Sequence, residues 1–417
     1  MRVLVLGGGV IGVATAYYLE RAGATVTVID RQAEPAGETS FANAGLIAPT
    51  HAYAWASPRA PGTLLRSLWR DDTALRLKPR LDPGLMRWGL RFLAECSAAR
   101  NRANTLNKLR LCLYSLACLE RLRGDEGLAY EQTTKGALYL YRDAGHMAVA
   151  LENARLLREH GADIDVVDAA RCVAIEPALA GIAGRLAGAL YAPKDESGDC
   201  RLFTKKLAAR CAGLGTSFRW GTTVRGFEAS GDRVIAAITD LGRVEADAFV
   251  LALGSYSPLV ARSVGLRLPI HPVKGYSLTF PIVDAARAPT VPGVDEHALV
   301  AFSRLGDRLR LTATAEFTGY DTTHRPRDFA VMLRAVRELF PGAADYDRPE
   351  RWACLRPMTP DGPPIMGRAG KANLWLNTGH GHIGWTMAAG SGRVVADQVM
   401  GREPEIDLTG LVPDGRL

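Results

Sequence analysis

Two glycine-rich turns and one arginine in a proline-rich segment are the parts of this sequence best suited to bind and orient a ligand. Residues 7–12 read GGGVIG and place glycines at the G-x-G-x-x-G spacing, which lets a pyrophosphate approach the backbone. Residues 379–385 read GHGHIGW and precede a helical segment, whose N-terminus offers free N–H groups to an electron-rich atom. Arg356 lies in LRPMTPDG, which predicts a rigid turn that presents this arginine.

The first turn has the flanks of a dinucleotide-binding unit. We predict an apolar strand over 3–6, a helix over 10–22 and a β-branched strand over 25–29 that ends at Asp30. Asp30 stands about twenty residues after the glycines, where the fingerprint places a carboxylate for a ribose hydroxyl. The glycines are expected to allow, in order, the sharp turn, the phosphate approach and close helix packing: Gly7, Gly9 and Gly12. This unit alone leaves NAD, NADP and FAD open.

Two further segments are rich in small residues. ETSFANAG at 38–45 follows the second strand, and VLALGS at 250–255 reads as a buried strand that ends in glycine. Small side chains leave backbone N–H groups accessible, so we expect both segments to lie against the ligand.

Metal and disulfide chemistry find no support in the sequence. His380 and His382 stand two residues apart, but no cysteine or carboxylate partner accompanies them, so we predict no metal site. The seven cysteines are odd in number and scattered, and none forms a C-x-x-C pair. We expect reduced thiols.

Composition predicts a folded protein of two or three domains. The chain has 417 residues, of which 47% are hydrophobic, and no apolar run reaches the eighteen residues of a spanning helix. Because the first strand begins near Met1, we expect no targeting segment and a cytoplasmic location. No nucleic-acid-binding module accompanies the net charge of +7, so we expect no nucleic-acid partner.

The positive charge is concentrated in residues 62–102. This segment holds nine Arg or Lys residues and four acids, interleaved with Leu, Trp and Phe at helical spacing. The pattern suits a basic amphipathic region that contacts an anionic membrane or a partner, and equally a helix whose apolar side faces the core.

The remaining pattern predicts an α/β protein whose two parts interleave in sequence, because no long linker or repeat separates them. We expect helices over 103–123, 144–160, 168–175, 203–213 and 386–400. We expect strands over 136–141, 217–220, 224–228, 233–239, 244–253, 269–281, 307–318 and 374–377.

These motifs together resemble the FAD-dependent D-amino-acid oxidase superfamily, and within it the D-amino-acid dehydrogenase small-subunit family. The resemblance covers essentially the whole chain, and its motifs occur in matching order: VLGGGVIG, ETSFANAG, PKDESGDCRLFT, ALGSYS, PVKGYS, LRPMTPDG and NTGHGHIGWTMAAGSG. It implies non-covalent FAD and a Rossmann-like, glutathione-reductase-type FAD domain. Residues 1–50, 185–260 and 365–417 would form that domain. An α+β substrate domain with a mixed, largely antiparallel sheet would comprise 51–184 and 261–364.

The family chemistry is oxidative deamination of a D-amino acid. A hydride leaves Cα for flavin N5, water hydrolyses the imino acid to a 2-oxo acid and ammonia, and electrons pass to a respiratory quinone or another acceptor. The resemblance therefore implies peripheral contact with the inner face of the plasma membrane. It makes Arg356 the anchor of the substrate carboxylate and Tyr276 a second substrate contact or a core tyrosine.

The resemblance also assigns the residues around the ligands. Substrate-binding candidates besides these two are His51, Tyr53 and His382. The turn at 381–386 should stabilise negative charge on the reduced flavin. Expected cofactor contacts are Gly7, Gly9, Val10, Ile11, Gly12, Asp30, Arg31, Thr39, Ser40, Asn43, Ala44, Gly45, Leu46, Val224, Gly254, Gly379, His380, Gly381, Ile383, Gly384, Trp385 and Thr386.

Two departures from the family pattern leave alternatives open. His51 stands where the family often has tyrosine, and Tyr53 where it has a small hydroxyl residue, which leaves open a preferred substrate side chain other than that of alanine. Cys354 replaces a usual glycine and makes covalent flavin attachment the alternative to an ordinary buried thiol. The chain could instead be an oxygen-using oxidase of a cyclic or N-alkyl amino acid such as D-proline, hydroxyproline or a sarcosine-like amine. It could also be a flavoprotein subunit that needs a partner.

Overall fold

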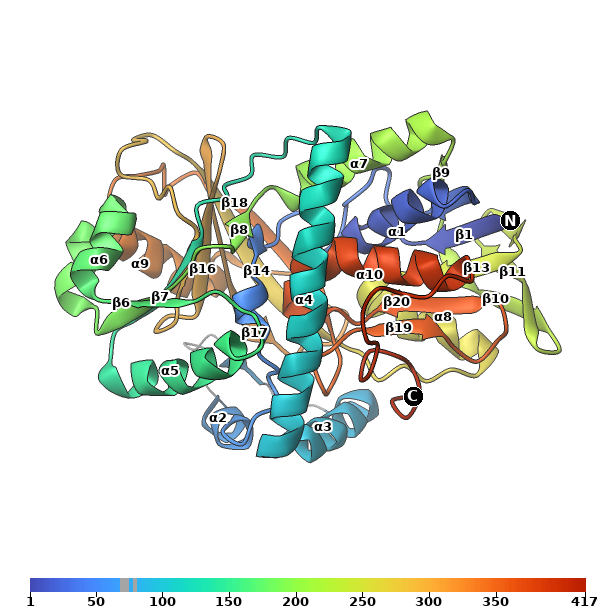
Figure 1. Ribbon diagram of the computed structural model, residues 1–417, viewed down its shortest axis with the longest axis horizontal. Coiled ribbons are helices and arrows are strands. Elements are labelled where there is room, and N and C mark those ends of the chain that lie inside the picture. Colours follow the sequence, from blue (N-terminus) through green and yellow to red (C-terminus); the bar gives the residue numbers. More distant parts are fainter. Residues whose placement is uncertain (68–74, 78–80) are drawn as a thin grey trace.

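The computed structural model describes residues 1–67, 75–77 and 81–417, which form two lobes built on separate sheets (Figure 1). One lobe contains a six-stranded sheet in the order β19-β20-β13-β1-β2-β9, parallel except for β19. Its strands are β1 (Arg2–Leu6), β2 (Thr25–Ile29), β9 (Ser217–Arg219), β13 (Ala248–Leu251), β19 (Ile365–Arg368) and β20 (Leu374–Thr378). The central strands are rich in Val, Leu and Ile and almost wholly buried, as parallel strands covered on both faces must be.

Four long helices pack on one side of this sheet: α1 (Val10–Arg21), α4 (Ala98–Glu126), α7 (Cys200–Leu214) and α10 (Gly384–Val399). Small residues let α10 pack closely between its neighbours. A Cβ on Gly390 would lie 2.8 Å from Ser115 Cα in α4, and one on Gly392 would lie 2.9 Å from the Ala14 carbonyl carbon in α1. The small-residue run in α10 therefore explains how α4 crosses it (Figure 1).

On the other side of the sheet lie α8 (Ser257–Ala261) and a three-stranded antiparallel sheet of β10 (Val224–Ser230), β11 (Arg233–Thr239) and β12 (Gly242–Glu245). The predicted strand over 244–253 is wrong in one respect, because it is divided between β12 and β13. Asp247 lies at the break, where its carboxylate accepts from the Arg2 N–H at 2.7 Å and its own N–H donates to the Arg2 carbonyl.

The second lobe contains a nine-stranded mixed sheet in the order β18-β14-β17-β16-β15-β5-β7-β6, with β4 also paired to β17. Its strands are β4 (Leu75–Arg76), β5 (Ala137–Tyr141), β6 (Asp165–Val167), β7 (Gly188–Ala192), β14 (His271–Pro281), β15 (Gly293–Asp295), β16 (Val300–Leu305), β17 (Arg308–Glu316) and β18 (Glu350–Met358). Helices α5 (Ala144–Arg158), α6 (Ala169–Ile175) and α9 (Ala330–Leu339) flank it. A two-stranded ribbon of β3 (Leu46–Ile47) and β8 (Glu196–Ser197) lies between the lobes.

The predicted domain ranges stay a prediction, but two elements pack with the lobe other than the one their range assigns. Strand β7 falls in the range predicted for the FAD domain, yet it pairs with β5 in the nine-stranded sheet. Helix α4 falls in the range predicted for the substrate domain, yet it packs on α10. It also extends beyond the predicted 103–123, because Ser97 caps its start and Gly127 ends it in a left-handed conformation.

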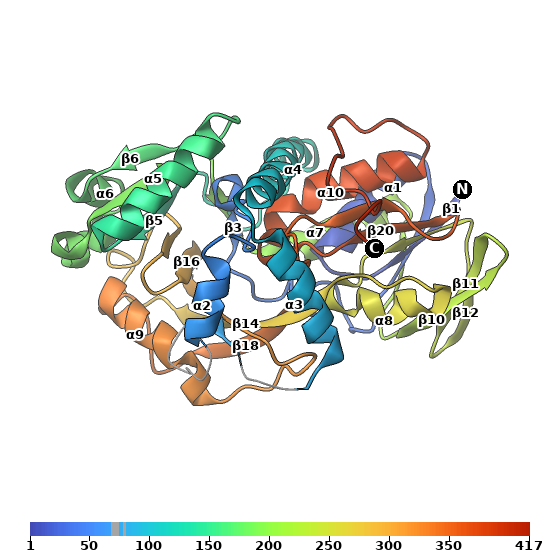
Figure 2. The same ribbon diagram turned by 90° about the horizontal axis from the view of Figure 1, so that it is seen from below.

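The basic region over 62–102 contains α2 (Ala60–Ser67), β4, α3 (Pro83–Glu95) and the start of α4; its residues 68–74 and 78–80 lie outside the described residues. Asp82 caps α3 by accepting from Gly84 N at 2.8 Å. Trp88 and Phe92 face inward, whereas Met86, Leu90 and Leu93 are exposed to 61%, 69% and 50%. Helix α3, which lies beside α2 and α4 in Figure 2, therefore presents apolar side chains both to the core and to the surface.

Candidate active site

A cavity of about 1460 Å³ lies between the two lobes. The first lobe contributes the turn after β1, the loop over 38–48 and the turn before α10. The second lobe contributes residues of β14 to β18, and the loop over 51–57 closes one side. Most sequence-predicted site residues meet here, although they come from opposite ends of the chain.

The glycine turn forms a cradle that side chains would fill. Gly7 has a φ of +122°, and a Cβ there would lie 2.4 Å from the Ala252 carbonyl oxygen. A Cβ on Gly12 would lie 1.8 Å from the Gly7 carbonyl oxygen, so this glycine lets α1 pack against the strand. Gly9 precedes α1 at the edge of the cavity, and the first N–H of the helix, that of Val10, donates to Ser40 Oγ. This is the geometry that a pyrophosphate requires.

Asp30 lies beside the cradle at the end of β2. Its carboxylate accepts from Gly8 N at 2.6 Å and from Gln32 N at 2.7 Å. Burial raises the pKa of this carboxyl, while the two backbone hydrogen bonds oppose the shift. Next to it, the Arg31 guanidinium lies 3.9 Å from the centroid of the Tyr256 ring, at the same end of the cavity.

The loop over 38–48 is held by backbone and side-chain hydrogen bonds that leave its inner surface to the cavity. Ser40 Oγ accepts from Val10 N at 3.0 Å, and Asn43 Oδ1 accepts from Gly45 N at 2.9 Å. Thr39 Oγ1 donates to the Leu355 carbonyl at 2.9 Å and so ties this loop to the strand that carries Arg356. Other predicted cofactor contacts that border the cavity are Ile11, Ala44, Leu46, Val224 and Gly254.

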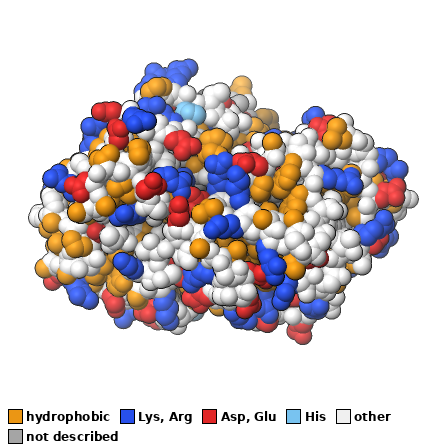
Figure 3. All heavy atoms as spheres, turned by 90° about the horizontal axis from the view of Figure 1, so that it is seen from above, with side chains coloured by type: hydrophobic (Ala, Val, Ile, Leu, Met, Phe, Trp, Pro, Cys, Tyr) orange, Lys and Arg blue, Asp and Glu red, His pale blue; other side chains and the backbone are white. Residues whose placement is uncertain are grey.

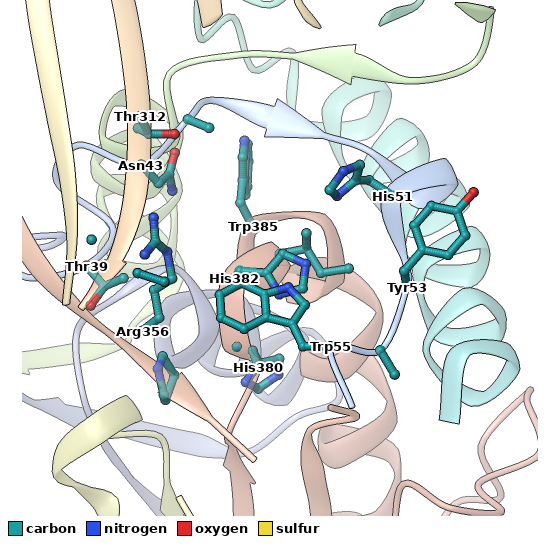
Figure 4. Close-up of a pocket in the computed structure, with 18 of the residues that line it drawn as sticks. Thr39, Asn43, His51, Tyr53, Trp55, Thr312, Arg356, His380, His382 and Trp385 are labelled. Atoms are coloured by element: carbon teal, nitrogen blue, oxygen red, sulfur yellow. The ribbon is translucent and has the colours of Figure 1, made fainter. Parts of the chain in front are cut away.

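The turn before α10 approaches the same cavity from the far end of the chain (Figure 4). His380, Gly381, Ile383, Gly384 and Trp385 border it. Burial lowers the pKa of His380 to about 3, so this imidazole stays neutral, and its Nε2 contacts Ser391 Oγ at 3.0 Å. The N-terminus of α10 has no side-chain cap among the described residues.

Three predicted cofactor contacts are not among the described residues that line the cavity: Gly12, Gly379 and Thr386. The Thr386 hydroxyl is buried and accepts from Ala48 N at 3.0 Å, which joins α10 to the loop over 38–48. The Thr386 side chain therefore positions the loop, and the cofactor contact expected at Thr386 stays a prediction. A Cβ on Gly379 would lie 2.8 Å from Thr359 Cγ2, so this glycine serves packing behind the turn.

Arg356 lies on β18 and spreads its guanidinium over Gly275 of β14. A Cβ on Gly275 would lie 2.3 Å from Arg356 Cζ, so only glycine leaves room for this arrangement. Arg356 Nη1 donates to the Thr314 carbonyl at 2.6 Å, and no carboxylate pairs with the guanidinium in the described part of the chain. Burial lowers the pKa of Arg356, yet an arginine remains charged. The cavity is therefore lined by a half-buried positive charge with free N–H donors.

Thr314 supports Arg356 through a strained backbone. Its φ of +67° lies in the left-handed region, which a β-branched residue rarely adopts and which costs roughly 1–3 kcal/mol. The pairing of β14 with β17 is irregular beside this residue. The strain therefore coincides with the carbonyl that accepts from Arg356.

Tyr276 corrects the sequence prediction. Tyr276 pairs with Ala353, three positions along the ladder from the pair Val273 and Arg356, so its side chain lies on the opposite face of the sheet. Its ring packs edge-on against Phe329, and its hydroxyl donates to Glu316. Although Tyr276 borders the cavity, it is the core tyrosine of the two alternatives.

The loop over 51–57 presents alternate side chains to the cavity while α4 holds its backbone. His51, Tyr53 and Trp55 line the cavity (Figure 4). On α4, Asn101 Nδ2 donates to the carbonyls at positions 54 and 56, at 3.0 and 2.7 Å. One turn further, Thr105 Oγ1 accepts from the N–H of residue 54 at 3.1 Å.

Lys108 completes this clamp. Its Nζ donates to the Tyr53 carbonyl at 3.0 Å, and the residue is only 1% exposed. Burial lowers the pKa of Lys108 to about 8. The three residues at 101, 105 and 108 form one stripe of α4 that fixes the loop.

His382 lies between the two sides of the cavity. Its ring stacks on Trp55 at a centroid distance of 4.9 Å and meets the His51 ring edge-on at 6.2 Å. Burial, aided by the charges of Lys108, His51 and Arg356, holds the pKa of His382 well below its usual value. His382 Nε2 and Trp385 Nε1 are buried without a hydrogen-bond partner in the described structure, so both atoms are open to a ligand.

Cys354 also borders the cavity, two residues before Arg356. Burial raises the pKa of its thiol. A neutral thiol is a poor nucleophile, and this favours non-covalent FAD.

Sequence reasoning missed Gly275, Thr314, Lys108 and Glu296 as parts of this site. Gly275 stood in the segment KGYS, but its role depends on the register that places it under Arg356. Lys108 carried no distinct signal, because Asn107 and Arg110 lie close to it in the predicted helix.

Comparisons with known proteins agree with this geometry. Residues 2–398 match the family described as "DAO: FAD dependent oxidoreductase". The chain is 50% identical over 416 residues to "D-amino acid dehydrogenase 2" of Mesorhizobium japonicum, covering 100% of both chains. It is 48% identical to "D-amino acid dehydrogenase" of Paramagnetospirillum magneticum, covering 99% of this chain and 98% of that one.

Among solved structures, glycine oxidase from Geobacillus kaustophilus superposes with a TM-score of 0.76 at 22% identity, covering 100% of this chain and 99% of that one. L-proline dehydrogenase from P. horikoshii superposes with a TM-score of 0.75 at 17% identity, covering 99% and 96%. These similarities support the fold. The glycine cradle, the N-terminus of α10 without a side-chain cap and the small-residue loop fit FAD, and the chain belongs to the family of FAD-dependent oxidoreductases.

Proposed function

We propose that this enzyme oxidises the α-carbon of D-amino acids and releases a 2-oxo acid and ammonia. The half-buried Arg356 guanidinium, free of any carboxylate partner in the described structure, carries the proposal. Its planar fork suits a substrate carboxylate, to which it can donate two charge-assisted hydrogen bonds. The relatives named D-amino acid dehydrogenase support the choice of substrate.

The residues around Arg356 orient the substrate. Gly275 leaves the guanidinium flat on the sheet, and the Thr314 carbonyl fixes one of its nitrogens. A substrate whose carboxylate accepts hydrogen bonds from the remaining N–H groups of Arg356 would have its Cα held in place by two or more contacts. Orientation of this kind can account for a large part of a rate enhancement.

The electrostatics of the site favour the neutral form of the amine. Arg356 and Lys108 are cations near His382, and burial keeps His380 and His382 uncharged. A neighbouring positive charge disfavours an ammonium group, so the substrate amine should lose its proton on binding. Bound FAD supplies the oxidant that accepts the hydride from Cα. Water then hydrolyses the imino acid in solution.

We also propose the cofactor contacts. The cradle at 7–11 and Asp30 would hold the pyrophosphate and ribose, and the loop over 38–48 would follow the dinucleotide. The open N-terminus of α10 and His382 Nε2 would face the electron-rich part of the ring system.

For the electron acceptor we propose a respiratory quinone or another electron-transfer partner, reached at a membrane surface on the cytoplasmic side. None of the described helices is both long and apolar enough to cross a membrane. Helices α2 and α3 lie on one face (Figure 2), where Leu65, Met86, Leu90 and Leu93 are exposed beside arginines of the same helices. Exposed apolar side chains flanked by arginine suit shallow contact with an anionic lipid surface. On the opposite face of the molecule, acidic and basic side chains are mixed (Figure 3).

The proposal is tested by product analysis. We expect the holoenzyme, with an artificial dye as acceptor, to form a 2-oxo acid and ammonia from a D-amino acid. The R356M variant should lose at least 100-fold in kcat/KM while it retains FAD. Peroxide formation without the dye would instead identify an oxygen-using oxidase, and activity that requires an added protein would identify a subunit. Unchanged kcat/KM in R356M would contradict the role of Arg356.

A further inference from the structure

We propose that Glu296, which contacts His51 and lines the cavity together with Tyr53 and Tyr141, forms a second polar end of the substrate cavity and selects D-amino acids with a basic side chain. This inference rests on the proposed oxidation of D-amino acids. It names the class of substrate that this enzyme should prefer.

The register of the nine-stranded sheet places Glu296 opposite the carboxylate anchor. Thr312 pairs with Ala301, and Ala301 pairs with Val294, so these three residues face the cavity in one row. Glu296 directly follows β15 and begins the turn that leads into β16, and Thr314, Leu299 and Glu296 also line the cavity.

The distance along this row matches a long side chain. Arg356 Nη1 bonds to Thr314 on β17, and Glu296 directly follows β15. Two strand spacings separate β17 from β15, which is roughly 10 Å. A D-amino acid bound by its carboxylate at Arg356 can bridge this gap only with an extended side chain. Figure 4 shows Arg356 on one side of the cavity and His51 and Tyr53 on the other, with His382 between them.

The Glu296 carboxylate is available to a ligand. Its Oε1 contacts His51 Nε2 at 3.1 Å, and its other oxygen has no hydrogen bond within the described structure. Its side chain is 18% exposed. Tyr53 and Tyr141 line the same cavity as Glu296, and burial, followed by the charge of Glu296, raises the pKa of both hydroxyls.

Buried hydrogen bonds hold this end of the cavity in place. The His51 ring stacks on Tyr139 at 5.4 Å, and the Tyr139 hydroxyl donates to Asp195 at 2.6 Å. Thr50, next to His51, donates to the same carboxylate. His51 and its partner Glu296 are therefore positioned before a substrate arrives.

A carboxylate among aromatic rings is a site for a cation. A guanidinium or ammonium group can pair with the charge and pack against ring faces. A neutral side chain of equal length would bury the carboxylate without pairing it, which is unfavourable. Helix α5 also borders the cavity. Two of its basic residues are already paired with acids, Arg155 with Glu159 and His146 with Asp143, so the cavity-lining Glu152 adds negative charge.

The test compares substrates of equal shape and different charge. D-citrulline is an uncharged analogue of D-arginine, and D-2-aminoheptanoic acid is one of D-lysine. We expect the wild-type holoenzyme to show a kcat/KM at least fivefold higher for the charged member of each pair. The E296Q variant should lose most of this ratio. The E245Q variant removes the same charge on the distant strand β12 and should keep it.

Two results would overturn the inference: a wild-type ratio below fivefold, or a ratio that E296Q leaves intact. If E296Q fails to fold, the wild-type ratio decides alone. Turnover of D-alanine without preference for the basic substrates would reject this inference and leave the proposed function standing. Absence of turnover with every D-amino acid, D-alanine included, would reject both.

Discussion

Replacement of Gly275 by alanine tests how Arg356 is positioned without touching its charge. The new Cβ would lie 2.3 Å from Arg356 Cζ, 2.4 Å from Nη1 and 2.5 Å from Nη2. Carbon atoms in ordinary contact are about 3.5–4.0 Å apart, so the guanidinium must move by roughly 1 Å. Because the φ of Gly275 is one that alanine adopts readily, the strand itself should tolerate the change.

A displacement of 1 Å in a positioning group can cost about 100-fold in rate, which corresponds to about 2.7 kcal/mol. We therefore expect G275A to lower kcat/KM for a D-amino acid by about 100-fold while FAD content stays at the wild-type level. The control is G213A in α7, where a Cβ meets open space and should leave kcat/KM unchanged. Dye-linked initial rates provide the measurement. A G275A enzyme within threefold of wild type would refute the argument that glycine keeps the arginine in place.

Three other predictions concern the clamp, the cradle and the surface. Lys108 has a folded-state pKa of about 8, below its unfolded value, so between pH 8 and 10 the unfolded chain binds more protons than the folded chain. The unfolding free energy of the wild type should therefore rise with pH relative to that of K108M, by up to about 1.4 kcal/mol per pH unit. Urea titrations at several pH values provide the measurement. G12A should lose bound flavin in gel filtration because its Cβ would lie 1.8 Å from the Gly7 oxygen, whereas G62A, with open space around its Cβ, should retain it. The double variant M86S/L90S should co-sediment severalfold less than the wild type with anionic phosphatidylglycerol vesicles. The control variant L241S, which removes a leucine that is 76% exposed on another surface, should bind the vesicles like the wild type. Equal binding by both variants would reject the membrane contact of α3.

The glycine turns and the elements around them could be predicted from the sequence, because each of these features depends on nearby residues. The strand–turn–helix over 2–21 follows from an apolar run, a glycine spacing and a helix that ends before Gly23. The gathering of the turns at 7–12 and 379–385 was predictable through the family resemblance.

The second wall of the site depends on register, which the sequence does not reveal. Strand β14 is buried at all positions except its last, so no alternation of polar and apolar residues indicates which face Tyr276 occupies. Glu296 and His51 are 245 residues apart and meet only through the order of the strands and the loop held by α4. Likewise, nothing in the local pattern around residue 247 indicates that a continuous run divides between two sheets.

The stereochemical claim is tested most directly by anaerobic flavin reduction. Solved structures of this fold include a glycine oxidase and an L-proline dehydrogenase, so the fold alone does not decide the hand of the substrate. We predict that mixing the holoenzyme with D-alanine or D-arginine, in the absence of oxygen and dye, bleaches the absorbance of the bound flavin. The corresponding L-amino acids should leave it unchanged. Bleaching by the L- but not the D-enantiomers would contradict the proposed function.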